Sequence, residues 1–145
     1  MDDLQRLLII EACRDLVLRA AECADGHDAA GLAALFVPDG VLRRPGGQPL
    51  LGRAAIAQAY AERPASRITR HLVTNTRVVV ESAIAAAARS RVLLCAGSTD
   101  DADGPHGRPQ RGPLLVGEFD DRFTLSDEGW RFASRDASFV LHASG

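Results

Sequence analysis

Apolar residues follow a helical spacing over the first 25 residues of the chain. Asp2 can cap a helix here, with Gln5 in the reciprocal position of a capping box. The apolar residues fall into two neighbouring rows, a width that predicts a helix buried over much of its circumference. The first row is Leu4, Leu7, Leu8, Ala12, Leu16 and Ala20, and the second is Ile9, Cys13, Val17 and Ala24. Asp25-Gly26 is expected to end the helix, with Gly26 as a left-handed cap.

Two shorter helices are predicted in the next part of the chain. Asp28 can cap the first of them, and its inward-facing residues would be Leu32, Leu35 and Phe36. The sequence Pro-Asp-Gly at 38–40 predicts a turn. The second helix is expected over residues 53–63, because Pro64 cannot continue it.

After these helices the apolar pattern changes to alternation, which predicts β-strands. A tight turn is expected at 126–129, and residues 98–112 form a polar loop that either lies on the surface or covers a pocket as a lid. Helices first and antiparallel strands afterwards predict one α+β domain over residues 1–145. The helices would pack on one face of a curved sheet, giving a cone with one open end. The expected strands cover residues 68–81, 91–96, 114–125 and 130–142.

Charge and composition exclude several classes of protein. The chain has 17 basic and 19 acidic residues, a balance that argues against nucleic-acid binding. All of the basic residues are arginines, so lysine Schiff-base chemistry and a P-loop lysine are excluded. The three cysteines and four histidines show no metal-binding spacing, and we expect neither a metal nor a cofactor. With no apolar run long enough for a membrane span and an acidic start, a cytoplasmic protein is expected.

Three motifs resemble SnoaL-like proteins of the nuclear-transport-factor-like superfamily. They are Asp25-Gly-His-Asp28 with the residues after it, the strand sequence Arg-His-Leu-Val-Thr-Asn at 70–75, and Gly117-x-Phe119-x-Asp121-Arg122 with Gly129-Trp-Arg and Arg135. The resemblance implies a cone-shaped α+β barrel with an apolar pocket, usually dimeric. The superfamily includes scytalone dehydratase, polyketide cyclases and ketosteroid isomerase. It also includes the structural small subunit of ring-hydroxylating dioxygenases, so the fold leaves enzymatic and non-catalytic functions open.

Asp25 and His71 are the candidate catalytic residues. Asp25 is expected at a helix C-terminus, where the helix dipole would raise the pKa of a carboxylate; otherwise it only makes a turn. Strict alternation places His71, Val73 and Asn75 on one face, so the imidazole would enter the pocket, unless it is a hydrogen-bonded core histidine. The resemblance implies that Asp25 and His71 match the catalytic aspartate and pocket histidine of dehydratase-like members. Such a dyad could remove a proton beside a carbonyl and return it to a leaving hydroxyl.

Four further residues are candidates for substrate binding: Tyr60, Asn75, Phe119 and Asp121. Asp121 shares its alternating face with Phe119, and it either acts as a base, as in isomerase and cyclase relatives, or pairs with Arg135. The sequence departs from the dehydratase pattern, because Ala24 stands where a tyrosine precedes the aspartate and no histidine lies in 91–96.

Two functional hypotheses follow from these residues. The first is a cofactor-free lyase, isomerase or cyclase that acts on an apolar cyclic or polyketide-like compound. The alternative is a non-catalytic ligand-binding protein, or a partner that resembles the small subunit of a dioxygenase. Apolar residues on both faces of the predicted strands, as in Val78–Val80 and 92–95, predict a homodimer that covers the outer face of the sheet.

Overall fold

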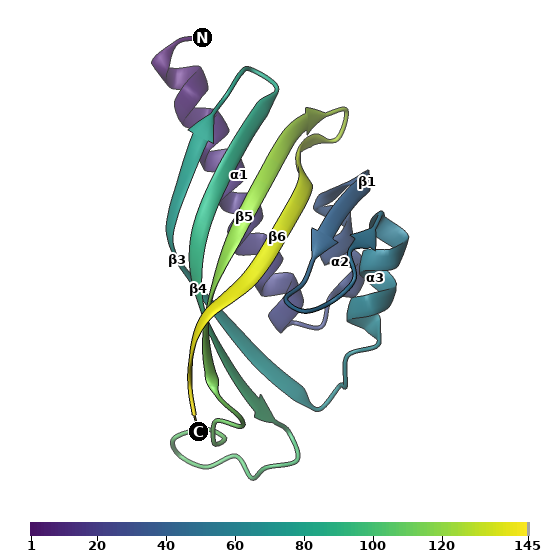
Figure 1. Cartoon of the computed structure of the whole chain (residues 1–145), viewed down its shortest axis with the longest axis vertical. Coiled ribbons are helices and arrows are strands. Elements are labelled where there is room, and N and C mark those ends of the chain that lie inside the picture. Colours follow the sequence, from purple (N-terminus) through teal and green to yellow (C-terminus); the bar gives the residue numbers. More distant parts are fainter. Residues whose placement is uncertain (145) are drawn as a thin grey trace.

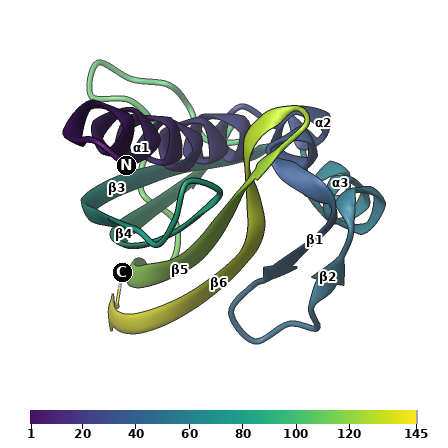
Figure 2. The same cartoon turned by 90° about the horizontal axis from the view of Figure 1, so that it is seen from above.

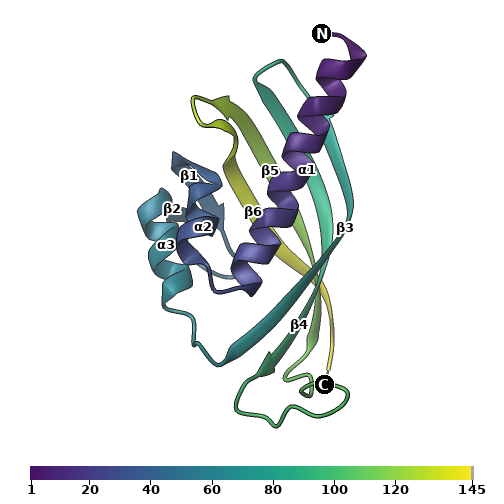
Figure 3. The same ribbon diagram turned by 180° about the vertical axis from the view of Figure 1, so that it is seen from behind.

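A curved six-stranded sheet wraps around one long helix (Figures 1 and 3). The computed structural model describes residues 1–144, so of the domain predicted over 1–145 only Gly145 lies outside the described residues. The helices are α1 (Asp3–Asp25), α2 (Ala29–Ala34) and α3 (Arg53–Ala61). The strands are β1 (Phe36–Arg43), β2 (Leu50–Leu51), β3 (Arg67–Val80), β4 (Ala85–Ser98), β5 (Leu114–Ser126) and β6 (Gly129–Ala143).

The strand order is β2-β1-β6-β5-β4-β3, and the sheet does not close into a barrel. Strands β3 to β6 form an antiparallel meander, and β2 is antiparallel to β1. Strand β1 runs parallel to β6, because the chain crosses from the β1 edge to the β3 edge before it returns. Figure 2, viewed from above, shows the sheet curving beneath α1, with α2, α3 and β1 at one side. The α+β fold with a curved sheet and N-terminal helices is confirmed, with one parallel pair that the sequence did not indicate.

Helix α1 begins with the predicted capping box, in which Asp2 accepts from the Gln5 amide and Gln5 accepts from the Asp2 amide. The second row and the C-terminal part of the first row face the protein interior, but the N-terminal part of the first row does not. The prediction of burial around most of the helix was wrong for Leu4, Leu7 and Leu8, which are more than half exposed. These residues lie on the end of α1 that projects beyond the sheet (Figure 3). The buried residues of α1 are Ile9, Cys13, Leu16, Val17 and Ala20.

The chain leaves α1 differently from the prediction. Gly26 has a φ of −88°, so it is not a left-handed cap. The left-handed residue is His27, with a φ of 54°, and its Nε2 donates to the Arg67 carbonyl oxygen at 2.7 Å. Asp28 caps α2 as predicted, accepting from the Gly31 amide at 2.8 Å. The helix ends at Ala34; of the residues predicted to continue it, Leu35 is the C-cap and Phe36 begins β1.

Strand β1 contains the segment predicted as a turn at 38–40. Its pairing with β6 passes from Phe36–Phe132 directly to Val41–Ser134, so the residues between bulge out of the ladder. The Pro-Asp-Gly sequence therefore forms a bulge inside β1 and does not end the strand. The turn-forming residues alone do not distinguish these two outcomes. Strand β4 is likewise continuous over Ala85–Ser98, although its alanines favour strands weakly. Pairing with β3 on one side and β5 on the other stabilises it.

Strand β3 changes its inward face at a β-bulge. Its pairing with β4 shifts between Thr74 and Arg77, and Asn75 lies in the left-handed region with a φ of 55°. Before the bulge the inward residues are Thr69, His71 and Val73; after it they are Thr76, Val78 and Val80. The prediction that Asn75 shares the face of His71 was therefore wrong, because one extra residue reverses the alternation.

The apolar core joins the buried faces of the three helices to strands β1, β4, β5 and β6. Phe132 stacks between Phe36 and Phe123, with ring centroids 5.0 Å apart in each pair. Cys13 and Val17 of α1 are completely buried in the same cluster. Val92 and Leu94 of β4 are also buried but do not belong to it. Within residues 1–144, no helix combines the length and the apolar character needed to cross a membrane.

Candidate active site

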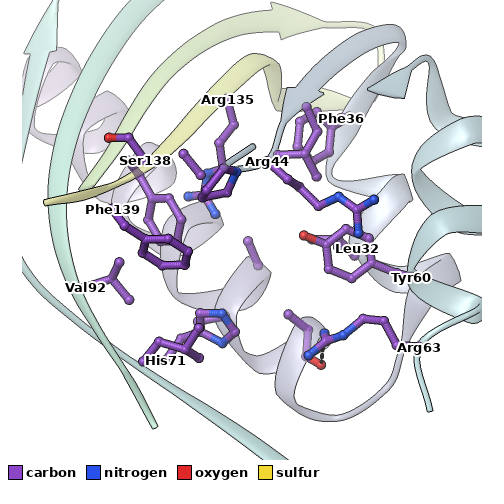
Figure 4. Close-up of a pocket in the computed structure, with 18 residues that line it drawn as sticks. Leu32, Phe36, Arg44, Tyr60, Arg63, His71, Val92, Arg135, Ser138 and Phe139 are labelled. Atoms are coloured by element: carbon purple, nitrogen blue, oxygen red, sulfur yellow. Dashed lines mark hydrogen bonds between the residues drawn. The ribbon is translucent and has the colours of Figure 1, made fainter. Parts of the chain in front are cut away.

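A cavity of about 170 Å³ lies beside the apolar core, which contributes Ala20, Leu32, Phe36 and Leu42 to its wall. We call it the cone cavity, and Figure 4 shows the side chains around it. Three alanines on the last turns of α1 leave room for it, and strands β3 to β6 supply most of the opposite wall. Its lining residues are Ala20, Ala21, Ala24, Leu32, Phe36, Leu42, Arg44, Pro45, Tyr60, Arg63, His71, Val92, Leu94, Phe119, Arg135, Ala137, Ser138 and Phe139.

Asp25 and His71 meet at the edge of the cone cavity. Asp25 is the last residue of α1, and His71 lies on β3 before the bulge. The Nδ1 atom of His71 is 2.5 Å from Asp25 Oδ1, and the backbone amide of His71 donates to Asp25 Oδ2 at 3.0 Å. The buried hydroxyl of Thr69 also donates to Asp25 Oδ1, at 2.9 Å. The predicted pairing of this carboxylate and this imidazole is confirmed.

The pKa of Asp25 is lower than its usual value. Burial raises this pKa, but hydrogen bonds from the ring and the backbone amide of His71 and from Thr69 outweigh the effect of burial. The expectation of a raised pKa from the α1 dipole was wrong, because three donors converge on the carboxylate. Asp25 is therefore ionised near neutral pH. It orients the imidazole and stabilises a positive charge on it, and it does not itself carry an exchangeable proton.

His71 presents its second nitrogen to the cone cavity. Since Nδ1 donates to a carboxylate, Nε2 carries the lone pair of a neutral ring. Within residues 1–144, Nε2 has no hydrogen-bond partner, and the ring points toward the centre of the cavity in Figure 4. The side chain of His71 is 18% exposed, so it is shielded from bulk water but open to a bound molecule. This arrangement is that of a general base with its orienting carboxylate.

Asp121 is completely buried and forms a bidentate ion pair with Arg135 at 2.7 and 2.9 Å. Burial raises the pKa of Asp121, and the guanidinium of Arg135 opposes that rise. Asp121 was predicted as a substrate-binding residue, but the structure does not place it among the residues that line the cone cavity. Of the two alternatives, the structure shows the pair with Arg135. Asp121 acts on the cavity only by holding Arg135, which stacks 3.8 Å from the ring centroid of Phe119.

The other candidates for substrate binding divide in the same way. Tyr60 and Phe119 line the cone cavity, and their roles as binding residues remain predictions. Asn75 is exposed at the bulge and lies outside the cavity, so the sequence-based placement there was wrong. The reason is the extra residue in β3, which aims the Asn75 side chain away from the face that carries His71.

The sequence analysis missed three residues around the site. Arg44 and Arg63 line the cone cavity beside Tyr60, and Thr69 supports Asp25. Arg44 follows β1 and Arg63 follows α3, and both segments read as ordinary polar connections. Only the topology, which brings these connections to the mouth of the cone, reveals their role. Thr69 carried a usable signal, because it is two residues from His71 on the same face of an alternating strand.

The long loop after β4 does not take part in the site. Its residues are mostly exposed, and the part of the chain that the structure describes places none of them along the cone cavity. Arg111 forms a bidentate ion pair with Asp101 within the loop, at 2.6 and 2.7 Å. The loop lies at the end of the sheet nearest the C-terminus (Figure 1), so the alternative of a lid was wrong. Across residues 1–144, no three His, Cys, Asp or Glu side chains cluster closely enough to hold a metal ion.

The sequence profile of the SnoaL-like domain matches residues 5–136. The chain belongs to the SnoaL-like family. The resemblance carried by Asp25–Asp28, residues 70–75 and the closing hairpin is thereby confirmed. No curated protein matches this SnoaL-like chain in sequence.

Solved structures of three proteins show the same fold. Hexachlorocyclohexane dehydrochlorinase (LinA) type 2 superposes with a TM-score of 0.83 at 18% identity, covering 99% of this chain and 93% of that one. A candidate scytalone dehydratase from Novosphingobium aromaticivorans gives 0.81 at 22% identity, with 97% and 90% covered. A protein from Novosphingobium aromaticivorans described as NTF2-like with a cystatin-like fold gives 0.71 at 26% identity, with 97% and 92% covered. The SnoaL-like chain therefore has the fold of a superfamily that contains dehydratases and a dehydrochlorinase.

Proposed function

We propose that this SnoaL-like protein is a cofactor-free lyase that removes a proton from carbon in a small cyclic substrate. The observation that carries the proposal is the Asp25–His71 dyad, whose free Nε2 faces the cone cavity. Apolar side chains supply most of the wall, including Leu32, Val92 and Leu94. A cavity of this kind excludes water from the base and binds an apolar ring.

In the proposed reaction, Nε2 of His71 takes a proton from a carbon next to an electron-withdrawing group. The C–H electron pair forms a carbon–carbon double bond, and the leaving group departs from the adjacent carbon with its bonding pair. Asp25 stabilises the imidazolium that results, because its carboxylate accepts a hydrogen bond from Nδ1–H of His71, with Nδ1 and Oδ1 2.5 Å apart. When the leaving group is a hydroxyl, the imidazolium gives its proton to the departing oxygen and water is released.

The cone cavity also has a guanidinium group away from the base, although that group is paired with a carboxylate. Arg135 lines the wall opposite His71 in Figure 4, and Asp121 and the ring of Phe119 hold its guanidinium in place. Negative charge that develops on a leaving group facing Arg135 would be stabilised there. Two of the structural neighbours are named for eliminations of this kind, the loss of hydrogen chloride and the loss of water. Their names support an elimination but do not identify the substrate of this protein.

The test is turnover of hexachlorocyclohexane, followed by chloride release, and of scytalone, followed by formation of the dehydrated product. Both compounds serve as surrogate cyclic substrates that lose a proton and a leaving group, and we expect the protein to convert at least one of them. We expect His71→Gln to lower kcat by about 10²–10⁴-fold, the usual contribution of a general base. Asp25→Asn should also lower kcat, because the amide cannot stabilise the imidazolium. The matched control is His106→Gln, in the exposed loop after β4, which should leave kcat unchanged.

Turnover that survives in His71→Gln would contradict the proposed role of this residue. Binding of apolar cyclic compounds without conversion of either substrate would favour the alternative of a ligand-binding protein. Copurification with the large subunit of a ring-hydroxylating dioxygenase would favour the small-subunit alternative. These outcomes separate the three functions that the fold permits.

We further propose that the protein forms a homodimer through the outer face of the sheet. Leu72, Leu93, Val116 and Leu141 are register partners in one row across β3 to β6. Leu72 and Leu141 are 55% and 67% exposed, so the row is open at both ends. A second copy would cover this apolar row. Sedimentation should show a dimer that Leu72→Glu weakens; a monomeric wild-type protein would contradict the proposal.

A further inference from the structure

Two arginines flank the only tyrosine at one wall of the cone cavity. The guanidinium carbons of Arg44 and Arg63 each lie 5.5 Å from the ring centroid of Tyr60. Figure 4 shows these three side chains on one side of the cavity, while His71, Val92 and Phe139 lie on the other. The hydroxyl of Tyr60 points into the space between the two sides. Arg44, Tyr60 and Arg63 therefore present hydrogen-bond donors to the same region.

The positively charged side chains that line the cone cavity differ in whether a carboxylate pairs with them. Its lining includes three arginines and a histidine but no carboxylate among the residues the structure describes. Arg135 is neutralised by Asp121, and His71 is hydrogen-bonded to Asp25. Within residues 1–144, neither Arg44 nor Arg63 has a carboxylate oxygen within 4.0 Å. Two positive charges therefore remain on the Tyr60 side.

Arg63 is held in place without being neutralised. It donates to the Ala24 carbonyl at 3.3 Å and to Thr69 Oγ1 at 3.4 Å. Burial is the main cause that lowers the pKa of Arg63; Arg67 and Arg44 also lower it, while Tyr60 and the carboxylate of Asp25 oppose the shift. A half-buried cation of this kind is stabilised by any anion that reaches it. The side chain of Arg44 makes no hydrogen bond within residues 1–144, so its guanidinium is available to the same anion.

We propose that Arg44, Tyr60 and Arg63 bind a carboxylate group of the substrate, so that the substrate is an organic acid with an apolar ring. This inference rests on the proposed function and names its class of substrate. A carboxylate matches the planar donor pattern of guanidinium groups, and the Tyr60 hydroxyl adds a third donor. The apolar ring would lie against Val92 and Phe139, and the carboxylate would orient it toward Nε2 of His71 across the cavity.

The wall that binds the anion is also connected to the base. Arg63 bonds Thr69, and the same Thr69 hydroxyl donates to the carboxylate of Asp25. Thr69 is thus the hydrogen-bonded link between Arg63 and Asp25. The site therefore fixes the position of the ring while leaving the interaction between Asp25 and His71 intact.

The experiment is isothermal titration calorimetry on the full chain with three matched pairs of probes. The pairs are benzoate and benzamide, trans-cinnamate and cinnamamide, and 2-naphthoate and 2-naphthamide. We expect the protein to bind at least one carboxylate about tenfold or more tightly than its amide. Arg44→Gln and Arg63→Gln should each reduce that ratio. The matched control is Arg6→Gln, an exposed arginine near the far end of α1, which should leave the ratio unchanged.

Equal affinity for acid and amide in all three pairs would overturn the inference, and so would a lack of carboxylate binding. A ratio that neither glutamine variant changes would also overturn it. Tighter binding of phenyl phosphate than of benzoate would overturn the choice of a carboxylate. If Arg63→Gln fails to fold, Arg44→Gln carries the test, because the side chain of Arg44 makes no hydrogen bond within residues 1–144.

The outcome is separable from that of the proposed lyase activity. The probes do not undergo the proposed elimination, so binding them does not require the base. His71→Gln should therefore still bind the carboxylates more tightly than the amides, although it turns over substrate much more slowly. A lost preference with intact His71-dependent turnover would overturn the anion site alone. A retained preference with turnover independent of His71 would overturn the lyase proposal alone.

Discussion

Nδ1 of His71 lies 2.5 Å from Oδ1 of Asp25, although the two residues are 46 positions apart in the sequence. The pairing depends on two local events. Helix α1 ends at Asp25, and the β3 bulge lies beyond His71 and not before it. One extra residue before position 71 would turn the imidazole to the outer face of the sheet.

The Asp25–His71 pair should make the stability of the protein sensitive to acid. The folded pKa of Asp25 lies below its unfolded value of about 3.9. Its contribution to the free energy of unfolding is therefore complete above about pH 3.9 and is lost as pH falls through the lower folded pKa. Urea denaturation between about pH 6 and pH 2 should show a larger acid loss in the wild type than in Asp25→Asn. Equal losses in both proteins would show that this carboxylate is not stabilised in the folded state.

The buried pair of Asp121 and Arg135 should be costly to break from one side. Asp121→Ala leaves a guanidinium that is only 7% exposed without its partner. We expect the free energy of unfolding to fall by about 3–5 kcal/mol, measured by urea denaturation. The control is the double variant Asp121→Leu, Arg135→Met, which removes both charges and should recover part of the loss. A double variant no more stable than Asp121→Ala would argue against this electrostatic explanation.

The bulge in β3 should depend on the backbone conformation of Asn75. Its φ of 55° suits glycine and asparagine but not a β-branched side chain. Asn75→Val should lower the free energy of unfolding by about 1–2 kcal/mol, and Asn75→Gly should be close to neutral. Ligand affinity should be unchanged in Asn75→Gly, because Asn75 lies outside the cone cavity. Equal stabilities of the valine and glycine variants would mean that the bulge is not strained in this way.

Cys13 should resist thiol reagents for as long as the protein is folded. Its side chain is completely buried in the core, and burial raises the pKa of its thiol to about 12. At pH 8, labelling followed by peptide mass spectrometry should find Cys13 unmodified in the native protein and modified after unfolding. The variant Cys13→Ala should show the same native labelling as the wild type. Modification of Cys13 as fast as the other two cysteines would show that the core opens around α1.

Local signals were sufficient to predict much of the fold. The caps at Asp2 and Asp28 and the hairpin turn at 126–129 depend on residues close together in sequence, and all three are present. Alternation also placed His71 correctly, because the strand is regular up to that point. These features persist because neighbouring residues decide them.

Other features depend on distant parts of the chain and were not visible in the sequence. The exposure of Leu4, Leu7 and Leu8 follows from where the sheet ends, which the helix itself does not encode. The lowered pKa of Asp25 required knowing that three donors reach it from β3. The positions of Arg44 and Arg63 follow from where two connections meet in space. The pattern of apolar and polar residues along the chain does not specify which distant segments come into contact.

The bulge at Asn75 separates residues of β3 that pack in the core from the residue of β3 that faces the cone cavity. On one side of it, Val78 and Val80 pack against the stacked phenylalanine core; on the other, His71 faces the cone cavity. Residues such as Val92, Ala137 and Phe139 can therefore diverge to suit new molecules without eroding the cluster that keeps the chain folded. Substitutions at these cavity residues can therefore alter substrate or reaction during evolution with little loss of folding stability.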